Sequence, residues 1–380
     1  MGVPLFDTRT PLAPLREEIG RRMEGVVEDG RFILGPNVEA FESEFAAYCG
    51  AAHAIGVANG TDAITIALRA MGVGPGDEVV VPSFTFYASA EAIPPTGARP
   101  VFCDVDPDTF CVTAETVKAA LTPRTKAVIA VHLFGNVAPV REIEALGVPV
   151  LEDAAQAAGS LWEDRVDAGG SGGEGGVRRP GALGMAATFS FFPSKNLGCF
   201  GDGGAITTSD AEIAERARML RFHGSRDKVT YEHVGCNSRL DELQAAILRV
   251  QLPHLDGWAD GRRAAGEHYE AAGLGELVSL PVAVAGSQPA WHLYVIRHER
   301  IEEVAAALRE AGHGHKAYYR TPIHRQPAMA PYANGLALPA TEEIARTHLA
   351  IPMSPVLRPE QATEVTGAIR RALAEAPRAP

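Results

Sequence analysis

One lysine stands in a stretch whose composition suits a nucleophile. Residues 188–204 run from a short apolar strand pattern into a polar, glycine-rich loop that carries Lys195. An ordinary lysine is protonated at neutral pH and does not attack carbonyl groups, so a nucleophilic lysine needs partial desolvation or a nearby cation. Four phenylalanines in the stretch could supply apolar surroundings, and its glycines let backbone approach a flat ligand closely. We interpret Lys195 as a lysine that forms a Schiff base; the alternative is a solvated surface charge.

An acid lies upstream, at the end of an apolar run. The run begins at Val148 and ends with Asp153, and small residues follow it. An acid just past the carboxyl end of a strand sits where open α/β sheets bind ligands, so Asp153 is placed to meet a cationic ring nitrogen. The alternative is that Asp153 caps a helix that follows it.

Together, Lys195 and Asp153 fit the requirements of pyridoxal phosphate (PLP). This cofactor needs a lysine for its aldehyde, an acid to keep its pyridine nitrogen protonated, an aromatic ring on its face and a cup for its phosphate. Gly60 and Thr61 lie between a strand pattern and a helix pattern, where backbone N–H groups favour an anion. The alternative is that Thr61 merely caps the helix.

Five segments, taken together, are similar to the nucleotide-sugar aminotransferases of the DegT/DnrJ/EryC1/StrS family. The similarity covers nearly the whole chain. The segments are NGTDA (59–63), PSFTF (82–86), EDAAQ (152–156), FSFFPSKNLG (189–198) and NSRLDELQAA (237–246).

The resemblance implies roles for further residues around the cofactor. Phe86 matches the aromatic residue that stacks on the ring, and Gln156 matches a glutamine near the ring hydroxyl. Ser190 matches a serine that binds the phosphate. Asn237 matches an asparagine that reaches the phosphate of the partner subunit, which implies a homodimer with shared active sites.

A segment near the C-terminus matches family residues beside the sugar. Tyr319 and His324 are the matching side chains, with a packed aromatic and a solvated loop histidine as the alternatives. Tyr318, Arg320 and Thr321 depart from the family pattern, so the identity of the substrate is least determined here.

The reaction that the resemblance implies is a two-step transamination from L-glutamate to a nucleotide-linked keto sugar. Lys195 would move the proton while Asp153 keeps the ring nitrogen protonated. Family members that aminate C4 tend to carry histidine where this chain has Phe192, which favours a dTDP- or UDP-linked 3-keto-hexose. A 4-keto sugar nucleotide and a keto-cyclitol are the alternative acceptors.

Two other classes of protein are disfavoured. Related PLP-dependent sugar dehydratases have histidine in place of the lysine, so Lys195 argues against them. A non-catalytic regulatory protein on this fold would be expected to carry an added DNA-binding domain, and the short leader before the first helix pattern leaves no room for one.

The elements that must position these residues form a repeating pattern. Apolar strand-like runs alternate with helical stretches, which predicts an α/β fold with a mainly parallel sheet covered on both faces. This agrees with the type I aminotransferase fold that the resemblance implies. We expect a large PLP-binding domain over residues 1–252 and a smaller α+β domain over residues 253–380. The expected strands are 54–57, 78–81, 100–103, 127–132, 149–151 and 187–191, and the expected helices include 15–29, 38–49, 62–71, 114–121, 301–311, 359–374 and one from 238, capped by Asn237 or Ser238.

Composition limits the possible partners and the compartment. The chain has 380 residues, 46% of them hydrophobic, and a net charge of −12, which argues against a nucleic-acid or anionic-membrane surface. No apolar run reaches membrane-spanning length, and the first residues lack a signal-peptide pattern, so we expect a cytoplasmic protein. Five scattered cysteines suit reduced thiols rather than disulfides.

Two further segments have plausible but weaker functional interpretations. Residues 104–115 place acids at four positions of a calcium loop, but Thr109 replaces the required glycine, so we predict no metal site. Residues 169–176 are glycine-rich and are expected to be a surface loop insertion, with a substrate lid as the alternative.

Overall fold

A central sheet organises the molecule. A computed structural model of the chain describes residues 2–163, 176–333 and 335–374. The strands of the central sheet are β1 (His53–Val57), β2 (Glu78–Pro82), β3 (Arg99–Cys103), β4 (Thr125–Val131), β5 (Val150–Asp153), β8 (Ala186–Ser190) and β9 (Gly204–Thr208). They lie in the order β1-β9-β8-β5-β4-β2-β3.

The direction of the strands confirms the predicted mainly parallel sheet. β3, β2, β4, β5 and β8 pair in parallel, and β9 runs antiparallel to both of its neighbours, β8 and β1. All six expected strand patterns are strands of this sheet. β9 was not recognised in the sequence, because it begins in the glycine-rich stretch.

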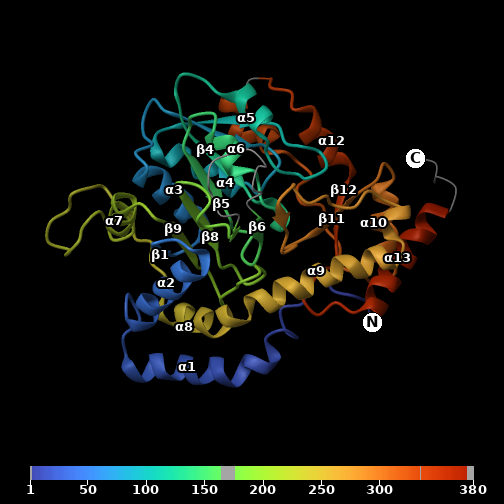
Figure 1. The fold of residues 1–380 in the computed structure, drawn as a ribbon, viewed down its shortest axis with the longest axis horizontal. Helices are drawn as coiled ribbons and strands as arrows, with labels where there is room; N and C mark the ends of the chain where they lie inside the picture. The colour runs from blue at the N-terminus through green and yellow to red at the C-terminus, as the bar shows by residue number, and fades with distance from the viewer. Residues whose placement is uncertain (1, 164–175, 334, 375–380) are drawn as a thin grey trace.

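Helices cover both faces of the sheet (Figure 1). Neighbouring residues of one strand enter different cores: Ile55 packs in the core with α3, whereas Ala54 packs in the core with α2. Since successive side chains of a strand point to opposite faces, this alternation places α2 and α3 on opposite sides. The helices are α1 (Arg16–Asp29), α2 (Pro36–Cys49), α3 (Gly60–Ala70), α4 (Ala88–Glu91), α5 (Ala114–Ala120), α6 (Val140–Glu144), α7 (Ala211–Leu220), α8 (Glu242–Gln251), α9 (Leu255–Ala271), α10 (Ile301–Glu310), α11 (Ala330–Ala333), α12 (Pro339–Thr347) and α13 (Pro359–Ala374).

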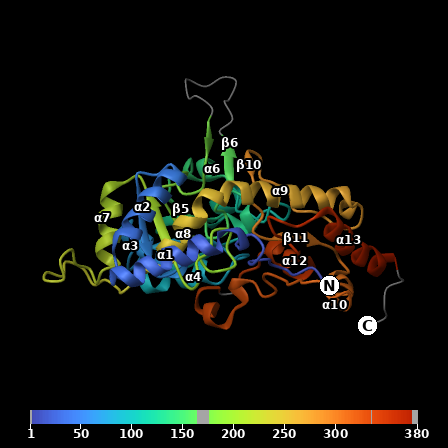
Figure 2. The same ribbon diagram turned by 90° about the horizontal axis from the view of Figure 1, so that it is seen from below.

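A third core belongs to the C-terminal part of the chain. It surrounds an antiparallel pair, β11 (Tyr294–Arg297) and β12 (His348–Ile351), and is covered by α10 and α13. α9 leads from the large sheet to this core, as Figures 1 and 2 show, with Leu255 in one core and Tyr269 in the other. Because α9 serves both, the division at residues 252 and 253 stays a prediction. The remaining strands, β6 (Leu161–Glu163), β7 (Val177–Arg178) and β10 (Ser287–Gln288), form a small antiparallel sheet.

One helix begins four residues later than expected. The helix expected from residue 238 begins at Glu242, and its N-cap residue is Asp241. Ser238 is not the cap because its hydroxyl accepts a hydrogen bond from the N–H of Ala58 at 3.0 Å. Asn237 lies in an isolated bridge with Phe222. The Ser238 hydroxyl, which the local pattern predicts as a helix cap, therefore takes part in a tertiary contact instead.

The acids of the calcium-like segment serve local structure. Asp106 Oδ1 accepts hydrogen bonds from the N–H groups of Asp108 at 3.1 Å and Thr109 at 2.8 Å, which closes a turn. Asp104 accepts the N–H of Thr341 at 2.8 Å, near the start of α12. Within the described ranges, no group of three or more His, Cys, Asp or Glu side chains could hold a metal ion. The glycine-rich insertion at 169–176 lies outside the described residues except for Gly176.

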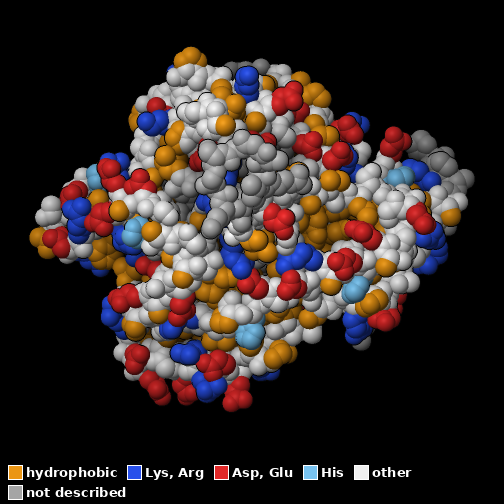
Figure 3. Space-filling view, viewed as in Figure 1, with side chains coloured by type: hydrophobic (Ala, Val, Ile, Leu, Met, Phe, Trp, Pro, Cys, Tyr) orange, Lys and Arg blue, Asp and Glu red, His pale blue; other side chains and the backbone are white. Residues whose placement is uncertain are grey.

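The visible surface mixes charges of both signs. Acidic and basic side chains are interspersed over the face shown in Figure 3. On α1, for example, Glu18 accepts a hydrogen bond from Arg22 at 2.8 Å. Among the described residues, none of the helices combines the length and the apolar character that a membrane crossing requires.

Candidate active site

A cavity of about 390 Å³ opens at the carboxyl ends of β1, β5 and β8. Parallel strands bring their carboxyl ends to one edge of the sheet, so residues that follow different strands meet there. Eight of the ten predicted site residues line this cavity: Gly60, Thr61, Phe86, Asp153, Gln156, Ser190, Lys195 and Tyr319. The other two, Asn237 and His324, do not line it.

Lys195 is half-buried in a tight loop directly after β8. Its N–H donates to the carbonyl of Phe192 at 2.8 Å, which closes the turn. Phe191, on the same loop, is fully buried against two phenylalanines of α2. Burial lowers the pKa of Lys195 to about 8, while the negative charge of Asp153 opposes that shift. The amine is therefore much closer to its neutral, nucleophilic form than a surface lysine is.

Asp153 ends β5 and is held by two donors. Ser89 Oγ donates to Oδ2 at 2.7 Å, and the N–H of Ala155 donates to Oδ1 at 3.2 Å. Thr85 Oγ1 lies 3.1 Å from Ser89 Oγ, and since the Ser89 proton is committed to Asp153, Thr85 is the donor. No helix follows Asp153 in residues 154–160, so the helix-cap interpretation is wrong.

The N-terminus of α3 faces the same cavity. Asn59 is the cap, with its Oδ1 accepting the N–H of Asp62 at 2.8 Å, so the alternative that Thr61 caps the helix is wrong. Gly60 is required by packing, because a Cβ there would lie 2.8 Å from the Cβ of Ser190. The N–H groups of the first turn and the Ser190 hydroxyl thus meet at a point where the helix dipole favours an anion.

Gly204 allows two backbone segments to approach each other closely. A Cβ on Gly204 would lie 2.6 Å from the backbone of Asn59, so this glycine lets β9 pass close to the α3 start. Two of the four phenylalanines of the motif, Phe189 and Phe192, line the cavity with Lys195, and Phe200 lines a second cavity with it. Phe192 lines the cavity half exposed, whereas Phe200 is 50% exposed and does not line it.

Three polar and aromatic residues form another part of the cavity wall. Gln156 Oε1 accepts the N–H of Phe134 at 2.7 Å, and its Nε2 donates to the Tyr319 hydroxyl at 3.2 Å. These two bonds fix the orientation of the amide. Phe86 is 53% exposed, and its ring centroid lies 5.9 Å from that of Tyr319. An exposed aromatic face at a cavity is available to stack on a flat ligand.

His324 lies in the wall behind the cavity rather than on its surface. Its Nδ1 is 2.6 Å from Ser83 Oγ, and its Nε2 is 3.2 Å from Glu342. The residue is only 4% exposed, so it is not the solvated loop histidine of the alternative either. Asn237 is exposed at the end of a segment, residues 221–237, that projects from the body beside α7 (Figure 1).

Sequence reasoning missed several residues of the site. Ser89 and Thr85 hold Asp153, and His292 and Phe6 line the cavity beside Lys195. For Ser89, the signal was its place three residues after Phe86, which is one helical turn. His292 and Phe6 come from distant parts of the chain, and no local pattern connects them to Lys195.

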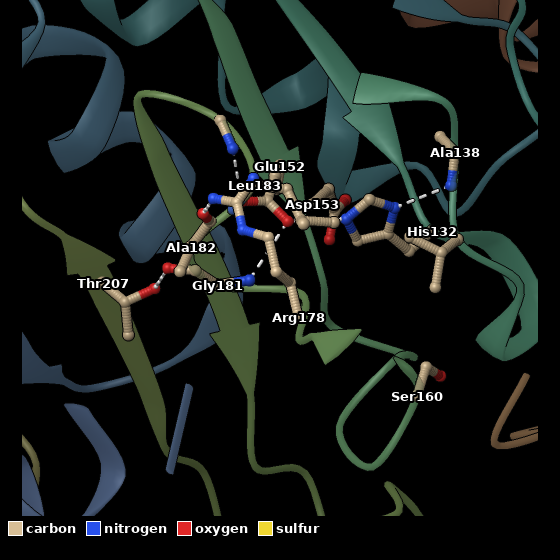
Figure 4. A network of polar contacts seen from close by, with 12 residues as sticks. His132, Ala138, Glu152, Asp153, Ser160, Arg178, Gly181, Ala182, Leu183 and Thr207 are labelled. Carbon is tan, nitrogen blue, oxygen red and sulfur yellow. Dashed lines mark hydrogen bonds and ion pairs between the residues drawn. The ribbon is translucent and has the colours of Figure 1, made fainter. Parts of the chain in front are cut away.

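A buried network supports the strand that carries Asp153 (Figure 4). The neighbouring Glu152 is fully buried and accepts hydrogen bonds from the N–H groups of Gly181 at 3.0 Å and Leu183 at 2.8 Å. His132 Nε2 lies 2.9 Å from Glu152, and because its Nδ1 accepts the N–H of Ala138, Nε2 is the protonated nitrogen. The network ties β5 to the chain that precedes β8, the strand that leads to Lys195.

The residues present fit PLP. Lys195, whose pKa is lowered by burial, faces the cavity together with the hydrogen-bonded carboxylate of Asp153. The negative charge of Asp153 partly offsets this lowering. The N-terminus of α3, where an anion is favoured, packs against Ser190 at Gly60. Phe86 offers an exposed ring. These four features are the lysine, the acid, the phosphate cup and the aromatic face that the cofactor requires.

The fold and this site define a class of protein. A mainly parallel sheet with helices on both faces, and a lysine and an aspartate at its carboxyl edge, are the features of the PLP-dependent aminotransferases. The family model of the DegT/DnrJ/EryC1/StrS aminotransferases matches residues 14–370. The chain belongs to this family, and it is a PLP-dependent aminotransferase.

Individual relatives cover nearly the whole chain. A Streptomyces venezuelae protein named dTDP-3-amino-3,4,6-trideoxy-alpha-D-glucose transaminase is 44% identical over 376 residues, which are 97% of this chain and 95% of the relative. A Geobacillus stearothermophilus protein named pleiotropic regulatory protein is 45% identical over 370 residues, 95% of this chain and 96% of the relative. The crystal structure of S. venezuelae DesV in complex with a ketimine intermediate has a TM-score of 0.91 at 43% identity, and the match covers 99% of this chain and all of that one.

Proposed function

We propose that this enzyme transfers the amino group of L-glutamate to a nucleotide-linked 3-keto sugar, favoured as a dTDP- or UDP-linked hexose, in amino-sugar biosynthesis. The observation that carries the proposal is the lysine of lowered pKa that shares one cavity with Asp153. The name of the S. venezuelae relative, a transaminase of a dTDP-linked 3-amino sugar, supports the choice of acceptor.

Lys195 is the proposed catalytic base and acid. PLP, when bound, supplies an electron sink and carries the amino group between the two substrates. Lys195 would hold the cofactor in the resting enzyme, and once the amine of the donor has displaced it, its free amine would move one proton at the substrate carbon. Its pKa of about 8 suits both directions of this transfer, because neither protonation state is strongly disfavoured near neutral pH. Asp153, held by its two donors, would lie against the pyridine nitrogen and keep it protonated.

The other lining residues bind and orient. Gly60, Thr61 and Ser190 would hold the phosphate at the start of α3. Phe86 would stack on the ring, and Gln156 would approach the ring hydroxyl. Tyr319 reaches the cavity from the C-terminal part of the chain, which supports its proposed contact with the sugar. His324 does not line this cavity, so we assign it the support of Ser83 instead.

The position of the ketone is proposed from one side chain. Phe192 lines the cavity and is 51% exposed, so it presents an apolar ring where C4-aminotransferases tend to carry an imidazole. A 4-keto sugar nucleotide and a keto-cyclitol are the alternative acceptors, and both would have to tolerate this ring.

We propose that the active unit is a homodimer in the cytoplasm. The projecting segment 221–237 exposes apolar side chains: Val229 is 80% and Val234 is 85% exposed. Contact with a second copy would cover them and would bring Asn237 to the phosphate of the partner. All five cysteines are free thiols, which suits a reducing compartment.

A half-reaction titration tests the function. The visible spectrum of the purified holoenzyme is recorded, L-glutamate is added, and 3-keto and 4-keto sugar nucleotides and a keto-cyclitol are then offered separately. We expect glutamate to bleach the cofactor band and the 3-keto sugar to restore it. A band that glutamate leaves unchanged would contradict the amino donor, and recovery with another ketone would correct the acceptor.

The regulatory name of the G. stearothermophilus relative is the reason to test a second function. If the protein has a regulatory role that needs no catalysis, a variant without the Lys195 amine should keep that role. If such a variant kept its full regulatory effect in the cell while glutamate no longer bleached the cofactor, the regulatory function would be supported over the enzymatic one.

A further inference from the structure

His292 is a buried histidine that lines the cavity without any hydrogen-bond partner in the described chain. It is 4% exposed, and its Nδ1 is enclosed and unpaired. Its ring stacks on Phe6, which also lines the cavity, with the ring centroids 5.8 Å apart and the planes 26° apart. Buried polar atoms are nearly always paired. With Nδ1 enclosed, the part of the ring that lines the cavity is the part that a bound ligand can meet.

The surroundings of His292 are cationic. Lys195 lines the same cavity, and Arg262 of α9 donates from Nη1 to the carbonyl of Trp291, the residue before His292, at 3.1 Å. Arg262 is 7% exposed, its Nε is unpaired, and it forms no ion pair with a carboxylate of the described chain. Burial together with the charges of Lys195 and Arg262 lowers the pKa of His292 well below its ordinary value. Because no carboxylate of the described chain pairs with Arg262, this buried cation favours an anionic ligand nearby.

The chemistry of the proposed reaction supplies such an anion. An amino-acid donor carries its carboxylate on the carbon that bears the reacting amine, so this carboxylate must lie beside the atom that Lys195 holds. The two acids that line the cavity, Asp153 and Asp202, would repel it. Among the described lining residues, His292 is the basic side chain other than Lys195.

We infer that His292 is the residue that recognises the carboxylate of the amino donor, taking up one proton from the solvent as the carboxylate binds. This inference rests on the proposed function. The arriving negative charge offsets the cationic surroundings and makes the imidazolium favourable. The keto sugar carries no carboxylate at this place, so His292 is neutral again in the second half-reaction. The protein thereby gains a contact that serves the donor and not the acceptor.

Maleate, a dicarboxylate without an amine, is the probe. It is titrated into the PLP-loaded enzyme by calorimetry in two buffers of different ionisation enthalpy, near neutral pH. We expect the wild-type enzyme to take up protons on binding. We expect His292→Gln to bind maleate about tenfold more weakly and without proton uptake, since a charge-assisted hydrogen bond is replaced by a neutral one. His292→Asn provides a second variant if the glutamine variant folds poorly.

His348→Gln is the matched control. His348 is fully buried, and its Nε2 is unpaired like the Nδ1 of His292, but it lies in β12 and does not line the cavity. A general effect of removing a buried imidazole would weaken maleate binding in both variants and would overturn the inference. An unchanged maleate affinity in His348→Gln, beside a loss in His292→Gln, supports it.

The outcomes separate this inference from the proposed function. If L-glutamate bleaches the wild-type cofactor band but His292→Gln binds maleate with full affinity and full proton uptake, the inference is wrong and the function stands. If His292→Gln loses affinity for the keto sugar as much as for maleate, the residue is structural and the inference is again wrong. If glutamate leaves the wild-type band unchanged, the proposed function fails first.

Discussion

Gln156 Nε2 donates a hydrogen bond to the hydroxyl of Tyr319 at 3.2 Å, although the two residues are 163 positions apart in the chain. The bond joins the turn after β5 to the segment that precedes the C-terminal helices. Because the other end of the Gln156 amide accepts the N–H of Phe134 at 2.7 Å, its orientation is fixed from both sides. The segment proposed to hold the cofactor and the segment proposed to meet the sugar are thereby joined at one side chain.

Loss of the Lys195 amine should abolish turnover. Lys195→Ala is expected to bind PLP without the resting cofactor band and to show no amino transfer, because Lys195 is the lysine that lines the cavity among the described residues. Stopped-flow spectra with L-glutamate measure this. Lys195→Arg, which keeps the positive charge, should be equally inactive, and added methylamine should restore part of the activity of Lys195→Ala alone. Amino transfer by Lys195→Ala at the wild-type rate would contradict the catalytic role proposed for Lys195.

The pH dependence of cofactor loading should report the lowered pKa of Lys195. The neutral amine attacks the aldehyde, so the rate at which the apoprotein takes up PLP should rise with pH around a midpoint of about 8. Since the charge of Asp153 raises this pKa, Asp153→Asn should move the midpoint to lower pH. A midpoint near the ordinary value of lysine would show that burial does not act on the amine as described.

The same shift has a consequence for the stability of the apoprotein. The folded pKa of Lys195 lies below that of an unfolded lysine, so between about pH 8 and the ordinary lysine value the unfolded chain binds more protons. The free energy of unfolding should therefore rise with pH through this interval. Urea titrations of the apoprotein at several pH values measure this rise, and Lys195→Met should reduce it.

Ser89 should matter for cofactor affinity although it does not resemble a catalytic residue. Ser89→Ala removes the 2.7 Å hydrogen bond to the buried Asp153 carboxylate, an interaction of about 1.5–3 kcal/mol for a charged acceptor. We expect weaker PLP binding, measured by equilibrium dialysis, by about tenfold to a hundredfold. Thr85→Val removes only the second hydroxyl of the pair and should have a smaller effect. Equal effects would contradict the order Thr85, Ser89, Asp153.

Gly60 should not tolerate a side chain. Gly60→Ala places a Cβ 2.8 Å from the Cβ of Ser190 and should push α3 away from β8, which would open the phosphate cup. We expect a loss of PLP affinity, measured by equilibrium dialysis, that is larger than the loss of thermal stability. Gly257→Ala is the control, since Gly257 lies within α9 and a Cβ there would have no atom within 4 Å, so alanine should stabilise the helix by up to about 1 kcal/mol. Full PLP affinity in Gly60→Ala would contradict the proposed phosphate site at the start of α3.

Local pattern predicted the fold class of this protein and the two residues proposed to carry its chemistry. The strand runs and helix periods specify which faces are apolar, and apolar faces specify a sheet covered on both sides. Lys195 and Asp153 each follow a strand of a parallel sheet, so their meeting follows from the rule that carboxyl ends share an edge. Composition and spacing therefore carried both the fold and the two central residues.

The three-dimensional packing settled what the pattern left open. Ser238 and Asp241 are both good caps by type, and a contact with Ala58 decides between them. His324 and His292 are both histidines near the C-terminal strands, yet one is bonded behind the wall and the other faces Lys195. Such choices depend on which distant segments pack together. A sequence reports the period of its own elements but not the contacts between elements, and those contacts place His292 beside the reacting lysine.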